Sequence, residues 1–272
     1  MTFVEKLNNA WRKNDSMVCV GLDPDLKKLP AVLKDEKYPI FAFNKALIDA
    51  TCHAVCAYKP QAAFYAGQQA EDQLLMTMEY LQKACPEIPV ILDVKRGDIG
   101  STASMYAKEA FDCYGADAAT VNPYMGTDTL KPFYDRKNKG VVILCRTSNP
   151  SGCELQNLIC DGKPVFIHVA ELARDQWNVN GNAALVVGAT CPEELARVRA
   201  VCPTMPLLVP GVGAQGGDVE AVVKNGCTAD GYGLIINSSR GIIYASAEAD
   251  FAEAAKAATE TLRDTINQYR GL

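Results

Sequence analysis

Short apolar runs alternate with amphipathic segments along the whole chain. Between the runs, apolar side chains recur at helical spacing, as in residues 41–54, 74–81 and 166–177. Runs of this length that are rich in β-branched residues and bounded by Gly or Pro are typical of buried strands in a parallel sheet. The eight predicted strands cover residues 18–22, 56–61, 90–92, 116–121, 141–145, 183–190, 206–213 and 232–236.

This alternation of strands and helices continues without a compositional break or linker. It favours a closed α/β barrel over an open doubly wound sheet, and the chain length of 272 residues is close to that of a TIM barrel. We therefore expect residues 1–272 to form a single domain, a (β/α)₈ TIM barrel.

Two segments are additional to the eight strand-helix units. Thr2 and Glu5 have the spacing of a capping box, so the chain is expected to open with an N-terminal helix that covers one end of the barrel. Residues 151–165 are interpreted as an insertion, in which Asp161 and Gly162 form the turn of a small hairpin.

Composition excludes several classes of function. The formal net charge of −5 gives no electrostatic basis for nucleic-acid binding. No apolar run approaches the length of a membrane span, and the N-terminus lacks the features of a signal peptide. The eleven cysteines include no C-x-x-C pair and lie in largely apolar surroundings. We expect reduced, buried thiols in a cytoplasmic protein.

Charged side chains gather at the predicted carboxyl ends of the strands. The segment LDVKRGDIGST places Asp93, Lys95 and Asp98 directly after an apolar run, and strand alternation directs Asp93 and Lys95 to the same side. Lys59 ends the second strand, and Asp23 ends the first. Because the carboxyl ends of barrel strands carry the active site in TIM-barrel enzymes, these residues predict a catalytic centre.

A phosphate site is predicted after the seventh and eighth strands, where Gln215 and Arg240 lie in loops rich in small residues. Gly211, Gly213 and Gly216 also fit the pattern G-x-G-x-x-G, but the chain ends too soon after them to complete a dinucleotide-binding domain.

Other catalytic classes have little support in the sequence. His53 and His168 are the only histidines, and both lie within helical patterns, which indicates packing or a surface role. No cluster of metal-ligating residues and no G-x-S-x-G motif is present, so neither a metal centre nor a hydrolase triad is expected.

The pattern D-x-K-x-x-D-I-G-x-T, from Asp93 to Thr102, resembles the signature of orotidine 5′-phosphate decarboxylases. The segments FNKALIDA, YKPQ, RTSNPSG and GVGAQGGD are similar to the longer, second bacterial-type branch of that family. The resemblance implies decarboxylation of orotidine 5′-monophosphate to uridine 5′-monophosphate in pyrimidine biosynthesis, without cofactor or metal.

The resemblance also implies roles for particular residues. Lys95 is expected to donate a proton to pyrimidine carbon 6, beside Lys59 and Asp93. It further implies a homodimer in which Asp98 and Thr102 reach the neighbouring subunit's site. The implied substrate contacts are Asp23 with ribose hydroxyls, Ser148 with the pyrimidine, and Gln215 and Arg240 with phosphate.

Two alternatives remain open from the sequence. The D-x-K pattern is shared with metal-dependent sugar-phosphate decarboxylases and aldolases of the same barrel type. A non-catalytic nucleotide-binding module would keep the phosphate site but lack the reaction.

Overall fold

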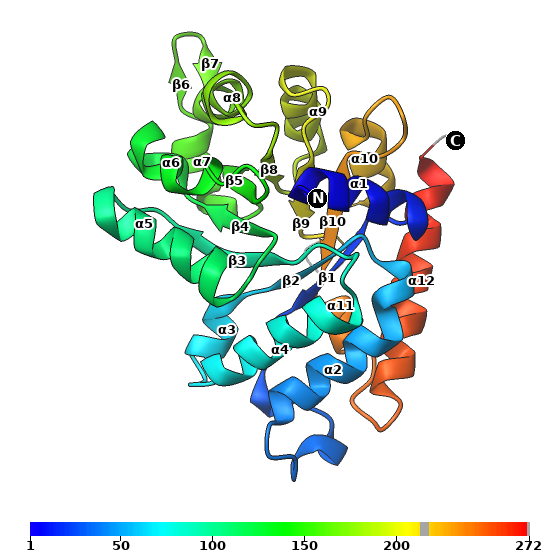
Figure 1. The fold of residues 1–272 in the computed structure, drawn as a ribbon. Helices are drawn as coiled ribbons and strands as arrows, with labels where there is room; N and C mark the ends of the chain where they lie inside the picture. The colour runs from blue at the N-terminus through cyan, green and yellow to red at the C-terminus, as the bar shows by residue number, and fades with distance from the viewer. Residues whose placement is uncertain (213–217, 271–272) are drawn as a thin grey trace.

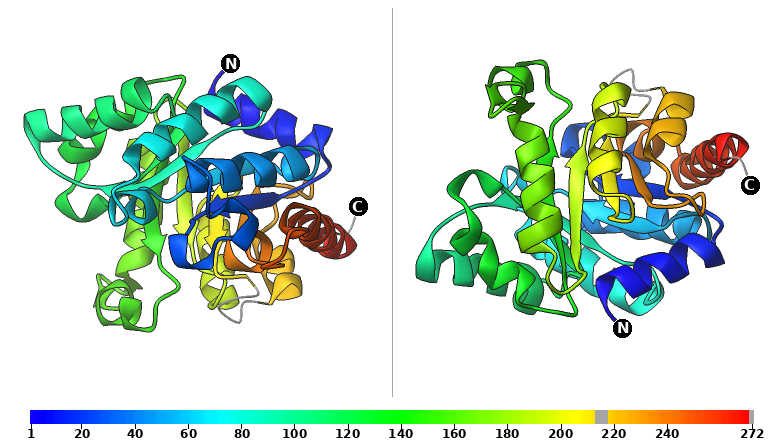
Figure 2. Two further views of the ribbon diagram at one scale, coloured as in Figure 1. Left: turned by 90° about the horizontal axis from the view of Figure 1, so that it is seen from below. Right: turned by 90° about the horizontal axis from the view of Figure 1, so that it is seen from above.

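The structure is a computed structural model that describes residues 1–212 and 218–270. Within these residues, eight parallel strands stand in the order β2-β1-β10-β9-β8-β5-β4-β3, and helices surround them on the outside (Figures 1 and 2). The predicted TIM barrel is confirmed. The strands are β1 (Val18–Leu22), β2 (Ala57–Pro60), β3 (Ile91–Arg96), β4 (Ala118–Val121), β5 (Gly140–Arg146), β8 (Ala183–Val187), β9 (Leu207–Pro210) and β10 (Leu234–Ser238).

Helices connect consecutive barrel strands. Helix α12, which follows the last strand, packs against α2 and α10 on the outside of the barrel. None of the helices in the described residues is long and apolar enough to cross a membrane. The α-helices are α1 (Phe3–Lys13), α2 (Pro39–Thr51), α3 (Ala62–Ala66), α4 (Glu71–Ala84), α5 (Gly100–Lys108), α6 (Thr127–Tyr134), α7 (Cys153–Gln156), α8 (Val165–Leu172), α9 (Pro192–Val201), α10 (Val219–Gly226), α11 (Arg240–Ile243) and α12 (Phe251–Tyr269).

The barrel closes between β2 and β3. Seven neighbouring pairs are joined by ladders in the described residues, whereas β2 and β3 meet only through isolated bridges, Tyr58 with Val90 and Gln61 with Asp93. Lys59 lies between the two bridge positions on β2. The closing seam of the barrel therefore coincides with the predicted catalytic centre.

The N-terminal helix α1 closes the opposite end of the barrel, as predicted. Thr2 and Glu5 form the expected capping box, which satisfies backbone N–H groups of the first turn. The Trp11 indole donates to the Leu234 carbonyl at the start of β10, 2.8 Å away, and Phe3 packs against Gly140 at the start of β5. This cover leaves the carboxyl ends of the strands as the open end of the barrel.

The expected hairpin in residues 151–165 is confirmed. Strands β6 (Ile159–Cys160) and β7 (Lys163–Pro164) pair antiparallel and project from the barrel beside α8 (Figure 1). Asp161 and Gly162 between them have φ values of 47° and 77°, the left-handed region that a tight hairpin turn requires. That the segment is an insertion stays a prediction.

Two predicted strands end on charged residues that lie beyond the apolar pattern. The third continues from Leu92 through Arg96, and the fifth includes Arg146, one residue beyond its predicted end. Arg146 is buried at the strand end because its guanidinium pairs with Glu194, with Nε and Oε2 2.6 Å apart. Charged partners contributed by other elements thus extend both strands beyond their apolar portions.

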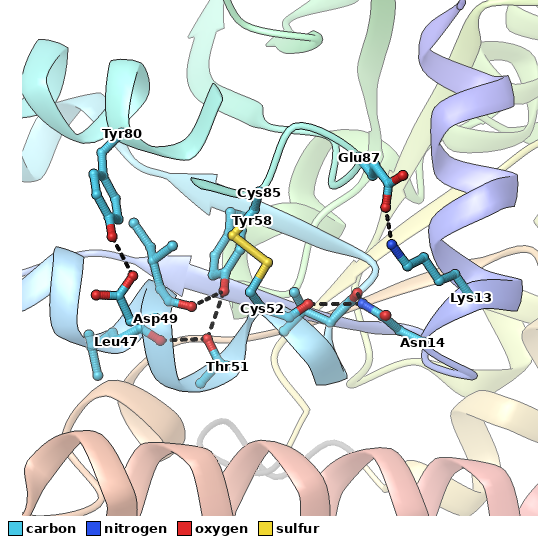
Figure 3. Close-up of a disulfide and its surroundings, with 12 residues drawn as sticks. Lys13, Asn14, Leu47, Asp49, Thr51, Cys52, Tyr58, Tyr80, Cys85 and Glu87 are labelled. Atoms are coloured by element: carbon cyan, nitrogen blue, oxygen red, sulfur yellow. Dashed lines mark hydrogen bonds and ion pairs between the residues drawn. A yellow bond between two sulfur atoms is a disulfide. The ribbon is translucent and has the colours of Figure 1, made fainter. Parts of the chain in front are cut away.

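The prediction that all cysteines are reduced and buried is wrong in two respects. Cys52, after α2, and Cys85, after α4, form a disulfide that lies beside Tyr58 of β2 (Figure 3). Three free cysteines are exposed: Cys113, Cys153 and Cys160. The disulfide links two helices that flank β2, a tertiary contact that cysteine spacing alone did not reveal.

The disulfide predicts a redox-dependent stability. Its cysteines are 33 positions apart, and closing a loop of that length stabilises a protein by about 3 to 4 kcal/mol in the chain-entropy model. Reduction with dithiothreitol is expected to lower the free energy of unfolding by that order, measured by urea denaturation. Cys85→Ser should show the same loss and no response to reductant.

Cys113→Ser provides the matched control, because Cys113 is an exposed free cysteine and its variant should keep the full response to reductant. Thiol titration of the denatured, unreduced wild-type protein should find nine free thiols among the eleven cysteines. Eleven titratable thiols would contradict the prediction.

Candidate active site

Three of the four predicted catalytic residues meet at the open end of the barrel. Lys59 Nζ lies 3.0 Å from Asp93 Oδ2, and Lys95 Nζ lies 2.6 Å from Asp93 Oδ1. The side chains of Lys59 and Asp93 are only 6% and 8% exposed, whereas that of Lys95 is 46% exposed. One buried carboxylate is therefore held between a buried ammonium and an ammonium that solvent or a ligand can reach.

Thr120 on β4 organises this group and was not identified from the sequence. Its hydroxyl donates to Asp93 Oδ1 at 2.8 Å and accepts from the backbone N–H groups of Val94 and Lys95, both at 2.9 Å. Lys95 has φ of 46°, so simple strand alternation does not continue through it. A lone threonine in an apolar strand carries no sequence signal of such a role.

The charges in the cluster support one another. Burial alone raises the pKa of Asp93, but the attraction of Lys59 and Lys95, with hydrogen bonds from Lys95 and Thr120, holds its pKa well below the ordinary value. Burial likewise lowers the pKa of Lys59, and the nearby carboxylates of Asp23 and Asp93 more than reverse this, so its pKa is raised. Asp93 is ionised and Lys59 is protonated at neutral pH.

Two cavities adjoin the charged cluster and share Lys59, Asp93 and Pro210 in their walls. The first, of about 380 Å³, is polar and lined on its far side by Asp23, Asn237 and Arg240. The second, of about 390 Å³, contains Lys95 and has a more apolar wall. Its other lining residues include Thr120, Leu144, Ser148, Val186 and Leu208.

The first cavity brings together Asp23 and Arg240, which are predicted to bind ribose and phosphate. Asp23 Oδ1 and Asn237 Oδ1 are buried and accept no hydrogen bond from any described residue, so each can accept one from a ligand hydroxyl. Arg240 is exposed at the start of α11 and lines the same cavity. Asn237 was not identified from the sequence, while Gln215 lies outside the described residues.

Ser148 lies in the wall of the second cavity, on the loop that follows β5. This position is separated from Asp23 and Arg240 by the Lys59–Asp93 pair, which both cavities share. The arrangement suits an elongated ligand with an anionic end beside Arg240 and a planar end beside Ser148 and Lys95.

Asp98 and Thr102 do not join the cluster within this chain. The Asp98 carboxylate accepts from the Ile99 backbone N–H at 2.8 Å and forms no ion pair with any described residue. Thr102 is exposed on α5. Both lie on the segment that leads away from the strand end.

The two histidines are remote from the cluster. His53 pairs with Glu260, at an Nε2–Oε1 distance of 2.7 Å, and the His168 ring contacts the Cys160 carbonyl at 2.7 Å. Their predicted packing or surface roles are confirmed. No group of three or more His, Cys, Asp or Glu residues in the described part of the chain could hold a metal ion.

A model of the orotidine 5′-phosphate decarboxylase / HUMPS family matches residues 16–258. The chain belongs to this family. The family resemblance drawn from the residues Asp93 to Thr102 is thereby confirmed, and the matched segment contains every residue of the charged cluster and of the two cavities.

Individual members of the family match almost the whole chain. An orotidine 5′-phosphate decarboxylase of Ralstonia pickettii is 57% identical over 270 residues, which cover 99% of this chain and 100% of that protein. The structure of Leishmania donovani OMP decarboxylase is 40% identical with a TM-score of 0.84 and full coverage of both chains. Leishmania donovani UMP synthase is 42% identical with a TM-score of 0.87, covering 99% of this chain and 57% of that one.

The Thr120 hydroxyl is expected to be required for the stability of the strand ends. Thr120→Val would leave two backbone N–H groups without their acceptor, and each such loss costs about 1 to 3 kcal/mol. We expect urea denaturation to show a free energy of unfolding lower by about 2 kcal/mol or more. Thr120→Ser keeps the hydroxyl and should recover most of the loss. Destabilisation by Thr120→Ser equal to that by Thr120→Val would contradict the prediction, because serine keeps the hydroxyl.

Proposed function

We propose that this protein decarboxylates orotidine 5′-monophosphate to uridine 5′-monophosphate in pyrimidine biosynthesis. The observation that carries the proposal is the Lys59–Asp93–Lys95 cluster, which stands between a polar cavity and a more apolar one. Membership of the orotidine 5′-phosphate decarboxylase / HUMPS family and the decarboxylase named at 57% identity support it.

The substrate is proposed to lie across both cavities. Its phosphate binds Arg240, together with Gln215, and its ribose hydroxyls donate to Asp23 in the first cavity. The pyrimidine enters the second cavity beside Ser148. Binding energy from the phosphate end can then be used to hold the reacting carbon against the charged cluster.

The reaction places a second carboxylate beside Asp93. The bond between carbon 6 and the carboxylate carbon breaks, carbon dioxide leaves, and the electron pair stays on carbon 6. Lys95 then transfers a proton from Nζ to this carbanion and regains one from solvent, which its 46% exposure allows. Lys59 and Lys95 face the developing negative charge, and Asp93 keeps both ammonium groups fixed.

The electrostatic contribution is large but limited. Two unit charges 4 Å apart interact by about 4 kcal/mol at an effective dielectric of 20. If one such interaction is made in the transition state and not in the ground state, it changes the rate by roughly a thousandfold. We assign the larger share to the fixed cations that face the carbanion, since preorganised charges need no rearrangement during the reaction.

Loss of the Lys95 ammonium is expected to abolish measurable turnover. Lys95→Ala should lower kcat by about a thousandfold or more, because it removes both a preorganised charge and the proton donor. The decrease in orotidine 5′-monophosphate absorbance measures turnover directly. Lys131→Ala, which removes an exposed lysine on α6, should be as active as the wild type.

The same assay with EDTA separates the two enzymatic alternatives. Activity that survives EDTA supports decarboxylation without metal, whereas complete loss would favour a metal-dependent sugar-phosphate decarboxylase or aldolase. Tight uridine 5′-monophosphate binding with no turnover would favour a non-catalytic binding module. Near-normal activity of Lys95→Ala would overturn the assigned proton donor.

We further propose a homodimer in which Asp98 and Thr102 complete the partner's site. Ile99, the N-cap of α5, and Thr102 and Met105 within the helix recur at a spacing of three, and Ile99 and Met105 are 58% and 62% exposed. The turn after β4 lies beside this segment, since the Asn122 N–H donates to the Arg96 carbonyl. It adds two more exposed apolar residues, Tyr124 and Met125. Such a patch beside polar residues supports an interface.

A shared site predicts that two inactive variants restore activity when they are mixed. In a heterodimer of Lys95→Ala and Asp98→Ala subunits, one site has both native residues and the other has neither. Random reassembly should therefore give about a quarter of the wild-type activity per site. Each variant alone should be nearly inactive. A mixture no more active than its components would show that Asp98 does not act across subunits.

A cytoplasmic location also stays a proposal. Nine free cysteines favour a reducing compartment, whereas the Cys52–Cys85 disulfide is typical of an oxidising one.

A further inference from the structure

We infer that the segment Pro150–Asn157 positions the pyrimidine-binding loop, with Gln156 as its principal positioning residue. This inference rests on the proposed function and extends it to part of the predicted insertion. Gln156 ends α7, outside the charged cluster, and contacts Thr147, the residue before Ser148.

The Gln156 side chain makes several contacts with Thr147. Its Oε1 accepts from the Thr147 backbone N–H at 2.9 Å, and its Nε2 donates to the Thr147 hydroxyl at 2.8 Å. Oε1 also lies 3.3 Å from Arg146 Nη1, which donates to it. Thr147 carries the first backbone N–H beyond β5, where no neighbouring strand supplies an acceptor. The side-chain amide of Gln156 supplies that acceptor instead.

A buried ion pair anchors this arrangement to the barrel. Arg146 Nε lies 2.6 Å from Glu194 Oε2, on the first turn of α9, and Arg146 Nη1 donates to the Thr147 carbonyl at 2.5 Å. Asn157 donates to the other oxygen of Glu194 at 3.0 Å. Residues 156 and 157 therefore bind both ends of the Arg146–Glu194 pair, which fixes α7 relative to the end of β5.

Two glycines show how closely the loop is packed. A Cβ atom on Gly188 would lie 2.7 Å from Ser148 Cα and 2.8 Å from Ser148 N. A Cβ atom on Gly152 would lie 2.9 Å from both Arg146 Nη1 and Thr147 Oγ1. The Thr147–Ser148 stretch is thus held between Gly188 after β8, which contacts Ser148, and the segment that carries Gln156, which contacts Thr147, so a shift of that segment displaces the loop.

The consequence concerns recognition of the base rather than of the phosphate. Ser148 lines the second cavity but not the first, which contains Arg240 and Asp23. Displacement of the loop should therefore weaken contacts with a pyrimidine ring while leaving the sugar-phosphate contacts unchanged. This difference distinguishes a positioning role from a general loss of structure.

Calorimetric titration of Gln156→Ala with uridine 5′-monophosphate and with ribose 5-phosphate tests the inference. We expect affinity for the nucleotide to fall by about tenfold, because the Thr147 backbone donor loses its partner. Affinity for ribose 5-phosphate should be unchanged, and KM for orotidine 5′-monophosphate should rise by a similar factor.

Two further variants control the experiment. Gln156→Glu retains an acceptor oxygen for the Thr147 N–H and should recover much of the nucleotide affinity. Leu158→Ala changes an exposed neighbour and should match the wild type in both titrations.

The outcomes separate this inference from the proposed function. A wild-type enzyme that decarboxylates normally, with Gln156→Ala unchanged or equally weakened toward both ligands, overturns the inference alone. A wild-type protein with no turnover and no preference for the nucleotide over ribose 5-phosphate overturns the proposed function and the inference with it.

Discussion

The active-site architecture depends on keeping the Asp93 carboxylate ionised inside the barrel. Removing a charge from water costs several kcal/mol, and only close partners of opposite charge offset that cost. Lys59 and Lys95 contact different oxygens of the same carboxylate, and Thr120 donates a third hydrogen bond. Each partner offsets part of the cost of burying Asp93, so the four side chains behave as one unit.

The location of this cluster at the closing seam of the barrel follows from the same requirement. β2 and β3 meet through isolated bridges instead of a continuous ladder, and the Lys59–Asp93 ion pair spans the two strands there. Polar side chains thus make the contact that backbone ladders make elsewhere. The Lys59–Asp93 pair thereby fixes the ends of β2 and β3 relative to one another where the backbone ladder is incomplete.

The surrounding elements divide the space around the cluster by chemistry. Asp23, Asn237 and Arg240 come from the ends of β1 and β10, which neighbour each other in the sheet. Ser148 comes from the loop after β5, whose position is set by α7 and α9. A polar and a more apolar cavity result because different parts of the sheet supply the two walls.

The sequence by itself determined the barrel, the N-terminal cap and the hairpin turn at Asp161–Gly162, because apolar periodicity and turn chemistry are local properties. It also identified Lys59, Asp93 and Lys95, since charge directly after an apolar run is conspicuous. Only the tertiary structure revealed Thr120, Asn237, the Arg146–Glu194 pair and the Cys52–Cys85 disulfide. Each of these depends on a partner distant in sequence, and a single threonine, asparagine or cysteine gives no indication of which distant residue it will meet.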